Sequence, residues 1–143
     1  MRWAGPGGYW VSDDRSLVDV AQVHGWLSTE SYWAAGRSYE VVARSVAESL
    51  TLGLYGPGDD QVGVCRLVTD YATFAWLCDV FVDTAVRAAG LGTFLVGTAT
   101  AHPAVRDLRL VLGTRDAHEL YRRFGFESLA AADRWMERRS SAP

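Results

Sequence analysis

Residues 87–92 read Arg87-Ala88-Ala89-Gly90-Leu91-Gly92, and this stretch decides the fold because it joins an expected strand to an expected helix. Before it, Thr73 to Val82 is a β-rich run with apolar residues on both faces. After it, apolar residues recur at helical spacing until His102-Pro103. Glycines let backbone N–H groups approach a ligand closely, and a helix start carries partial positive charge. The stretch therefore predicts an anion site, suited to a pyrophosphate, that needs no basic surface.

Three phosphate-binding motifs compete for this loop. A Walker loop ends in Gly-Lys-Ser/Thr, whereas here Gly92 is followed by Thr93-Phe94. A dinucleotide fingerprint needs a third glycine, where this chain has Leu95. The third pattern is Arg or Gln, then x-x-Gly-x, then Gly or Ala, and residues 87–92 satisfy each of its fixed positions. This pattern resembles the acetyl-CoA loop of the GNAT superfamily of N-acetyltransferases.

Two flanking segments make the resemblance more specific. Val80-Phe81-Val82 stands where GNAT proteins have a strand whose backbone pairs with the pantetheine arm. Residues 117–126 are similar to the superfamily's Ala-x-x-Leu-Tyr-x-x-x-Gly-Phe signature. The resemblance covers Tyr9 to about Arg138 and implies one α+β domain with a mixed, mostly antiparallel sheet flanked by helices. It also implies that the sheet is splayed between the strands at 73–82 and 108–112 to admit acetyl-CoA.

The resemblance implies a cofactor site with acetyl-CoA as the acetyl donor and no metal. Its expected residues are Val80, Phe81, Val82, Arg87, Ala88, Ala89, Gly90, Leu91, Gly92, Thr93 and Thr114. Three of them depart from common family choices: Ala88 replaces a frequent glycine, Ala89 a frequent basic residue and Thr114 a frequent asparagine. The missing cation at position 89 would weaken phosphate affinity.

The catalytic role implied by the resemblance falls on Tyr121, the signature tyrosine, as general acid. A phenol with an ordinary pKa near 10 stays protonated at neutral pH and can supply a proton to the departing thiolate. A backbone N–H near Val80 is expected to stabilise the oxyanion. For the general base we expect Asp79, with Asp70, Glu30 and His24 as alternatives.

Acceptor recognition is expected at two places where GNAT proteins vary their substrate pockets. One is the irregular segment with Tyr32 and Trp33, and the other is the turn at Asp70 and Tyr71. Aromatic side chains there could wall an apolar pocket or hold a cation over a ring face.

Outward from this centre, the sequence pattern predicts the remaining elements. We expect strands at Tyr9 to Val11, Thr51 to Tyr55, Val62 to Thr69, Leu108 to Leu112 (buried on both faces) and Arg134 to Arg138. Helices are expected from Leu17 to about Leu27, from Ser38 as N-cap to Leu50, and from Asp116, where Asp116 and Glu119 have capping-box spacing. The strands between 51 and 82 form an antiparallel meander. Residues 1–8 and 139–143 are expected to be loose.

Composition argues against several function classes. The chain has 143 residues, 49% hydrophobic and 22% charged, with a formal net charge of −3, which fits one globular domain without a basic face for nucleic acid. No apolar run is long enough to cross a bilayer, and no signal-peptide pattern is present, so we expect a cytoplasmic protein. Cys65 and Cys78 lack metal-site spacing and are expected to stay free thiols, nearly opposite each other in a hairpin.

The function expected from these features is direct acetyl transfer to a primary amine of a small molecule or peptide, without a covalent enzyme intermediate. A non-catalytic acyl-CoA-binding or sensor module of the same fold is the alternative. A nucleotide-binding protein of another class is disfavoured by the missing lysine and third glycine. Homodimer formation remains open.

Overall fold

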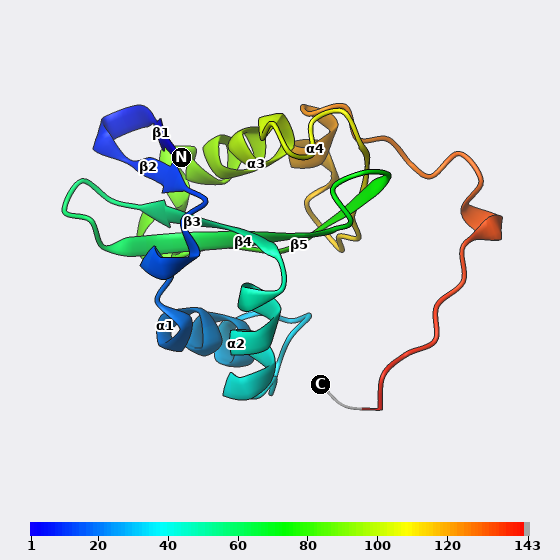
Figure 1. Ribbon diagram of the computed structural model, residues 1–143, viewed down its shortest axis with the longest axis horizontal. Helices are drawn as coiled ribbons and strands as arrows, with labels where there is room; N and C mark the ends of the chain where they lie inside the picture. Colours follow the sequence, from blue (N-terminus) through cyan, green and yellow to red (C-terminus); the bar gives the residue numbers. More distant parts are fainter. Residues whose placement is uncertain (142–143) are drawn as a thin grey trace.

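Six strands form one sheet, and their spatial order is their order along the chain (Figure 1). The computed structural model describes residues 1–141. The strands are β1 (Arg2–Ala4), β2 (Trp10–Ser12), β3 (Leu50–Tyr55), β4 (Gln61–Thr69), β5 (Phe74–Val82) and β6 (Arg109–Val111). Neighbours from β1 to β5 are antiparallel, whereas β5 and β6 are parallel. The expected mixed, mostly antiparallel sheet is therefore confirmed.

Helices cover both faces of this sheet (Figure 1). On one face lie α1 (Val20–Gly25), the π-helical turn η3 (Trp26–Glu30) and α2 (Tyr39–Ala47), which pack on Val64 and Phe81. On the other face α3 (Leu91–Ala101) and α4 (His118–Arg122) pack on a larger apolar core. The short helical turns η1 (Pro6–Gly8), η2 (Arg15–Leu17), η4 (Thr84–Ala89) and η5 (Ala132–Arg134) complete the elements. None of the helices within residues 1–141 combines the length and apolar character that a membrane span requires.

The central meander and the helix after the glycine loop are confirmed to within two residues at each end. Ser38 is the N-cap of α2, as expected, because its hydroxyl accepts a hydrogen bond from the Val41 N–H at 3.3 Å. The expected single helix from Leu17 is instead broken into η2, α1 and η3. The Asp19 side chain accepts from the Gln22 N–H and starts α1 anew, and the Ser31 N–H bonds to the Trp26 carbonyl in a wider turn.

Three terminal features differ from the sequence expectations. Arg2–Ala4 forms β1, paired with β2, where a loose end is expected. The strand at 108–112 is shorter and is not buried on both faces, because the Arg109 side chain is exposed. Arg134 to Arg138 is not a strand: η5 ends at Arg134, and the following residues run apart from the sheet (Figure 1). Ala142 and Pro143 of the expected loose C-terminus lie outside the described residues.

The start of α4 also differs. The Ala117 N–H donates to the Thr114 hydroxyl at 3.1 Å, and no side chain caps the helix at Ala117 itself. Glu119 pairs with Arg122 at 2.6 Å rather than reaching back. The expected capping box of Asp116 and Glu119 is therefore wrong, because a hydroxyl two residues earlier takes the capping position.

The sheet is irregular where β5 passes its middle. The register between β4 and β5 shifts between Val64 and Arg66, and Asp79 on β5 has a φ of +50°. Arg66 is therefore the residue opposite Cys78, so Cys65 and Cys78 project to opposite faces of the sheet. On its other edge, β5 pairs with β6 only through Phe74, Ala75 and Trp76. From residue 77 to its end, that edge of β5 has no strand beside it in the part of the chain that the structure describes.

Candidate active site

The glycine loop presents open space at the start of α3. Gly90 has a φ of +72°, which L side chains rarely adopt, and ends η4 so that the helix begins at Leu91. A Cβ added at Gly90 or Gly92 would meet no atom within 4 Å. The first-turn N–H donors of the eleven-residue α3 are therefore approachable from outside. This geometry fits a bound pyrophosphate.

Arg87 does not extend from this loop. Its Nε donates to the Val82 carbonyl at 2.8 Å, and its guanidinium carbon lies 4.9 Å from the centre of the Phe81 ring. The side chain therefore closes the end of β5 and links it to η4. Ala88 and Ala89 belong to the same turn, and neither residue type brings a cation to the loop.

The strand expected to hold the pantetheine arm offers its backbone rather than its side chains. Phe81 is buried towards η3, where it stacks on Trp26 at 5.5 Å, and Val82 is buried in the core on the opposite face. Val80 packs partly against that second core. Because no described strand pairs with this part of β5 on the β6 side, its backbone groups there can hydrogen-bond to an extended ligand, except that the Val82 carbonyl already accepts from Arg87.

Tyr121 lies on α4 beside a hollow of about 260 Å³ that β6, Thr114 and residues 126–129 also line. Its side chain is buried, with the ring edge-on to Phe126 at 5.9 Å. Burial raises the pKa of the phenol to about 12, with smaller contributions from Cys65 and Tyr32. Its hydroxyl makes no hydrogen bond to any described residue. Tyr121 thus lines the hollow, and its hydroxyl is not engaged by another described residue.

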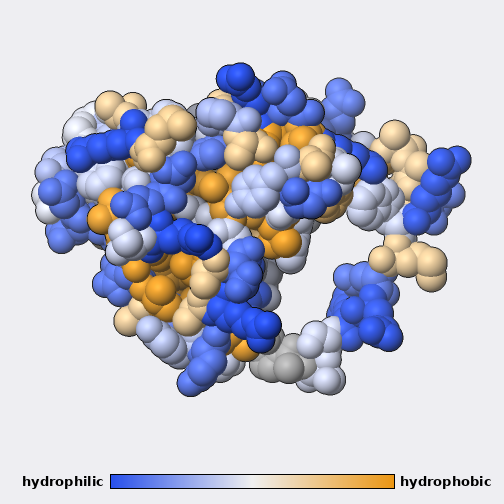
Figure 2. Space-filling view, viewed as in Figure 1, coloured by the Kyte–Doolittle hydropathy of each residue, from blue (hydrophilic) through white to orange (hydrophobic). Residues whose placement is uncertain are grey.

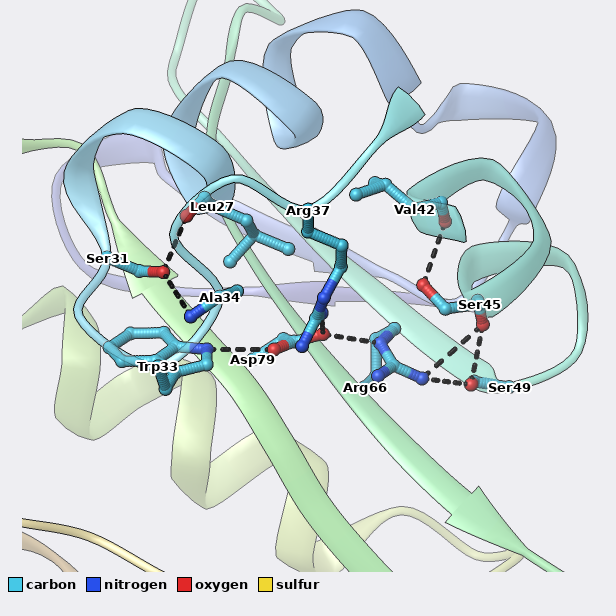
Figure 3. Close-up of polar contacts among 10 residues, drawn as sticks. All are labelled: Leu27, Ser31, Trp33, Ala34, Arg37, Val42, Ser45, Ser49, Arg66 and Asp79. Carbon is cyan, nitrogen blue, oxygen red and sulfur yellow. Dashed lines mark hydrogen bonds and ion pairs between the residues drawn. The ribbon is translucent and has the colours of Figure 1, made fainter. Parts of the chain in front are cut away.

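Asp79 has a different character from the one expected of a general base (Figure 3). The residue is only 5% exposed. Its Oδ1 accepts from the Trp33 indole N–H at 2.8 Å, while its Oδ2 accepts from Arg37 at 2.9 Å and from Arg66 at 2.8 Å. Both carboxylate oxygens are therefore engaged by donors from the protein, and neither is left to face an acceptor amine. This geometry favours a positioning role for Asp79 over the base role.

The Asp79 contacts fix the segment of residues 31–37, which we call the acceptor segment. On the sheet side, Trp33 and Arg37 both hydrogen-bond to Asp79 of β5. On the opposite side, the Tyr32 hydroxyl accepts from the Arg115 N–H at 3.0 Å, and the Arg115 guanidinium carbon lies 3.8 Å from the Tyr32 ring centre. The acceptor segment therefore reaches from β5 to the loop between β6 and α4, across the opening beyond Trp76. Tyr32 and Trp33 keep 47% and 40% of their surface exposed.

Asp70 and Tyr71 are not brought to this place. They form the turn between β4 and β5, and Phe74 at the start of β5 is roughly 17 Å along the strand from Asp79. The Asp70 carboxylate accepts from the N–H groups of residues 72, 73 and 74 and from the Thr73 hydroxyl, and these bonds hold its pKa well below the usual range. Asp70 thus stabilises the turn, and Tyr71, which is 56% exposed, lies at its tip.

A larger hollow of about 610 Å³ lies at this turn end of the sheet, away from the glycine loop, and its walls include Trp76 and Trp135.

Of the other base candidates, His24 Nε2 lies 3.1 Å from the Arg37 carbonyl and supports the acceptor segment. Glu30 is exposed at the end of η3.

Sequence reasoning missed Arg37, Arg66 and Arg115. Arg66 could have been noticed, since it is the one charged residue in the apolar run from Val62 to Thr69. No sequence signal marks Arg37 or Arg115, because their partners are 42 and 83 residues away.

Comparison with known proteins decides the family. A family model described as "Acetyltransferase (GNAT) domain" matches residues 28–128, which include the acceptor segment, Asp79, the glycine loop and Tyr121. The chain belongs to the GNAT family. A GNAT protein from Xanthomonas campestris pv. campestris, solved as a crystal structure, is 39% identical and superposes with a TM-score of 0.90 over 95% of this chain and 96% of its own.

More distant relatives agree with the GNAT assignment. A crystal structure from Deinococcus radiodurans R1 has 20% identity and a TM-score of 0.72 over 97% of this chain and 94% of its own, which shows a shared fold. A Gibberella zeae protein named as an acetyltransferase is 29% identical over 63% of this chain. The match spans 61% of that relative's length.

Proposed function

We propose that this GNAT protein transfers the acetyl group of acetyl-CoA directly to a primary amine in the cytoplasm, with Tyr121 as the general acid. The observation that carries the proposal is the Tyr121 side chain, which is buried, lines the hollow of about 260 Å³ and has a hydroxyl without a hydrogen bond to any described residue.

Three parts of the chain would hold the donor. The start of α3 at Gly90 and Gly92 would bind the pyrophosphate, and the free edge of β5 from Val80 to Val82 would pair with the pantetheine arm. Thr114 lies in the wall of the hollow beside Tyr121, and its hydroxyl can still donate a hydrogen bond while it accepts one from the Ala117 N–H. Bound acetyl-CoA supplies a thioester carbonyl that an amine can attack.

Tyr121 would donate its proton towards the leaving sulfur. A phenol with a pKa of about 12 is a weak acid against an ordinary thiol, whose pKa is roughly 8.5. Complete proton transfer to a free thiolate would therefore be uphill, so Tyr121 would act while negative charge is still developing on the sulfur.

The remaining roles fall to fixed groups. A backbone N–H near Val80 would stabilise the oxyanion without any side chain. Because both oxygens of Asp79 are engaged, we propose that the amine loses its proton to water before it attacks. The acceptor would lie against Tyr32 and Trp33, whose exposed rings suit an apolar or cationic group. Only an acceptor some 17 Å long, such as an extended peptide, would also touch Asp70 and Tyr71.

The test is thiol release from acetyl-CoA with a panel of small amines and peptides, combined with calorimetric CoA binding. The wild type should turn over at least one amine. Tyr121→Phe should lower kcat by about 10²-fold or more and leave CoA affinity within a factor of about two. Full activity in Tyr121→Phe would overturn the general-acid role.

A matched pair of glycine variants tests the donor site. Gly92→Glu should abolish CoA binding, because it sets a carboxylate against the pyrophosphate at the helix start. Gly58→Glu is the control, since a Cβ there likewise meets no atom within 4 Å but lies in the β3–β4 turn. Tight CoA binding without turnover of any amine would favour the sensor alternative.

A further inference from the structure

The larger hollow, of about 610 Å³, lies between the turn end of the sheet and the C-terminal tail, residues 129–141. Figure 2 shows an open gap between this tail and the rest of the molecule, with hydrophobic residues of the body beside it. Hollows of roughly 300–1,000 Å³ with mostly apolar walls are the usual sites of small molecules in proteins. The apolar part of the wall includes Val68, Phe74, Trp76, Leu112, Leu129 and Trp135.

Two of these wall residues are exposed although they lie on inner strands of the sheet. Val68 on β4 and Trp76 on β5 are partners in the register of the two strands, and they are 39% and 45% exposed. The helices on this face pack on Val64 and Phe81, further along the strands. The turn end of the face therefore presents apolar surface to the hollow, and exposed apolar patches of this kind mark interaction sites.

The larger hollow is on the same face of the sheet as the acceptor segment. Arg66 and Val68 are two residues apart on β4 and therefore point to the same side. Arg66 donates to Asp79, which also accepts from Trp33 of the acceptor segment. Trp76 precedes Asp79 by three residues, roughly 10 Å along β5. A molecule seated against Trp33 can therefore extend along the sheet into the larger hollow.

The larger hollow also adjoins the hollow that Tyr121 lines. Val111, Leu112, Gly113 and Leu129 belong to the walls of both. At Gly113 no side chain stands between the two, and a Cβ added there would meet no atom within 4 Å. An amine can therefore point towards Tyr121 while the rest of its molecule occupies the larger hollow.

The chemistry of the wall favours a neutral, apolar occupant. Asp70 and Glu137 are the charged residues among those that line the larger hollow. The Asp70 carboxylate is engaged by N–H groups of its own turn, and Glu137 pairs with Arg139 at 3.1 Å. The rings of Trp76 and Trp135 pack well against aromatic or branched aliphatic groups. Two carboxylates in the wall would also repel an anionic occupant.

We propose that the larger hollow binds the body of the acceptor, so that the acceptor is a small primary amine with a neutral aromatic or branched aliphatic body. The choice of an amine rests on the proposed acetyl transfer. The binding of an apolar body is a property of the hollow alone and can be tested without the reaction.

An NMR titration of the full chain in the absence of CoA and acetyl-CoA tests the hollow by itself. Phenethylamine should bind about tenfold or more tightly than ethylamine, because only its ring reaches the apolar wall. In the thiol-release assay kcat/KM should follow the same order. Equal binding of the two amines would overturn the proposal even if the protein acetylates an amine. Tighter binding of phenethylamine without turnover of any amine would support the hollow and contradict the acetyl transfer.

Neighbouring tail residues offer a matched pair of variants. Trp135→Ala removes a ring from the wall and should raise the dissociation constant of phenethylamine about fivefold or more. Met136→Ala is the control, since Met136 is 96% exposed and is not among the wall residues, and it should leave the constant unchanged. Neither change removes a buried side chain, so both variants should keep the fold, which circular dichroism checks. Equal constants in Trp135→Ala and the wild type would overturn the proposal.

A second pair of variants tests the sheet side of the hollow. Val68→Asp places a charge in the apolar wall and should weaken phenethylamine binding about tenfold or more. Val41→Asp makes the same change at an exposed valine on α2, outside the wall, and should have no effect. Unchanged binding in Val68→Asp would contradict the site. Binding that weakened as the protein concentration rose would also overturn the proposal, because a second copy of the chain would then cover the hollow.

Discussion

Asp79 combines an unusual backbone with an unusual set of partners. Its φ of +50° is in the left-handed region, which aspartate and asparagine tolerate better than most residues. Its carboxylate accepts hydrogen bonds from Trp33 and Arg37 of the acceptor segment and from Arg66 of β4 (Figure 3). Arg66 in turn donates a hydrogen bond to the Ser49 hydroxyl at 2.6 Å. One residue therefore links the bulge of the sheet to the segment that we assign to the acceptor.

Asp79→Asn should destabilise the protein by about 3 kcal/mol, because Arg37 and Arg66 both lose the carboxylate with which they form ion pairs in a buried setting. Asparagine keeps the backbone preference, so the loss is chiefly electrostatic. Urea unfolding measures the free energy, and the exposed Asp60→Asn is the control. KM for the acceptor should rise more than kcat falls, since the acceptor segment loosens. A variant that unfolds like the wild type would contradict the positioning role.

The pH dependence of turnover tests Tyr121. Because burial raises the pKa of its phenol to about 12, the protonated form persists well above the ordinary value of 10. The rate should therefore rise with pH as the amine becomes neutral, without a falling limb from phenol ionisation below about pH 11. Tyr121→Phe should show the same rising limb at a lower rate. A falling limb near pH 10 that disappears in Tyr121→Phe would show that the phenol is not shifted.

Residue types with local meaning could be predicted from sequence, and residues that act through distant partners could not. Gly90 and Tyr121 stand in short motifs whose backbone and chemical demands are local. The contacts of Asp79 could not be predicted, because its three donors come from residues 33, 37 and 66, which only the folded sheet brings together.

Among the elements, those with a strong period and their own turn residues were foreseeable. The meander from β3 to β5 has alternating apolar residues, a Gly/Pro/Asp turn and the Asp70 turn. The last part of the chain has neither a strong period nor turn residues of its own. Whether residues 134–138 become a strand depends on which sheet edge they pair with. Sequence pattern alone does not supply that edge.

The cap of α2 permits a clean test at the level of one helix. Ser38→Ala should cost about 1 kcal/mol of stability, since the Val41 N–H loses its acceptor. Ser38→Asn keeps a side-chain acceptor at this position and should retain most of the wild-type stability. The difference between the two midpoints in urea isolates the cap, and equal loss in both variants would assign the effect to packing instead.

Across the whole molecule, one contact ties the first strands to the end of α3. His102 follows α3 and its Nε2 lies 2.9 Å from Asp13 Oδ2, while its Nδ1 accepts from the Ala104 N–H. Burial acts to raise the pKa of Asp13, but hydrogen bonds from the N-terminal ammonium and His102 outweigh it, so the pKa lies below 3.8.

A lowered pKa in the folded state fixes the sign of the pH effect. The stabilisation by Asp13 is fully present above the unfolded pKa of 3.8 and is lost as pH falls through the lower folded value. Asp13→Asn should therefore melt at a lower temperature than the wild type at pH 7, and the gap should narrow below about pH 3. Melting curves at both pH values measure it, and a gap that widened in acid would contradict the assignment.

The hydrogen bonds that Asp79 accepts from residues 33, 37 and 66 also constrain how this protein can be re-engineered. A loop grafted from another family member in place of residues 31–37 would lack the indole that donates a hydrogen bond to Asp79 and the guanidinium that forms an ion pair with it. A change of acceptor preference would then destabilise the fold unless residues 79 and 66 were exchanged together with the loop. Libraries that vary all three places together are the ones we expect to yield active proteins.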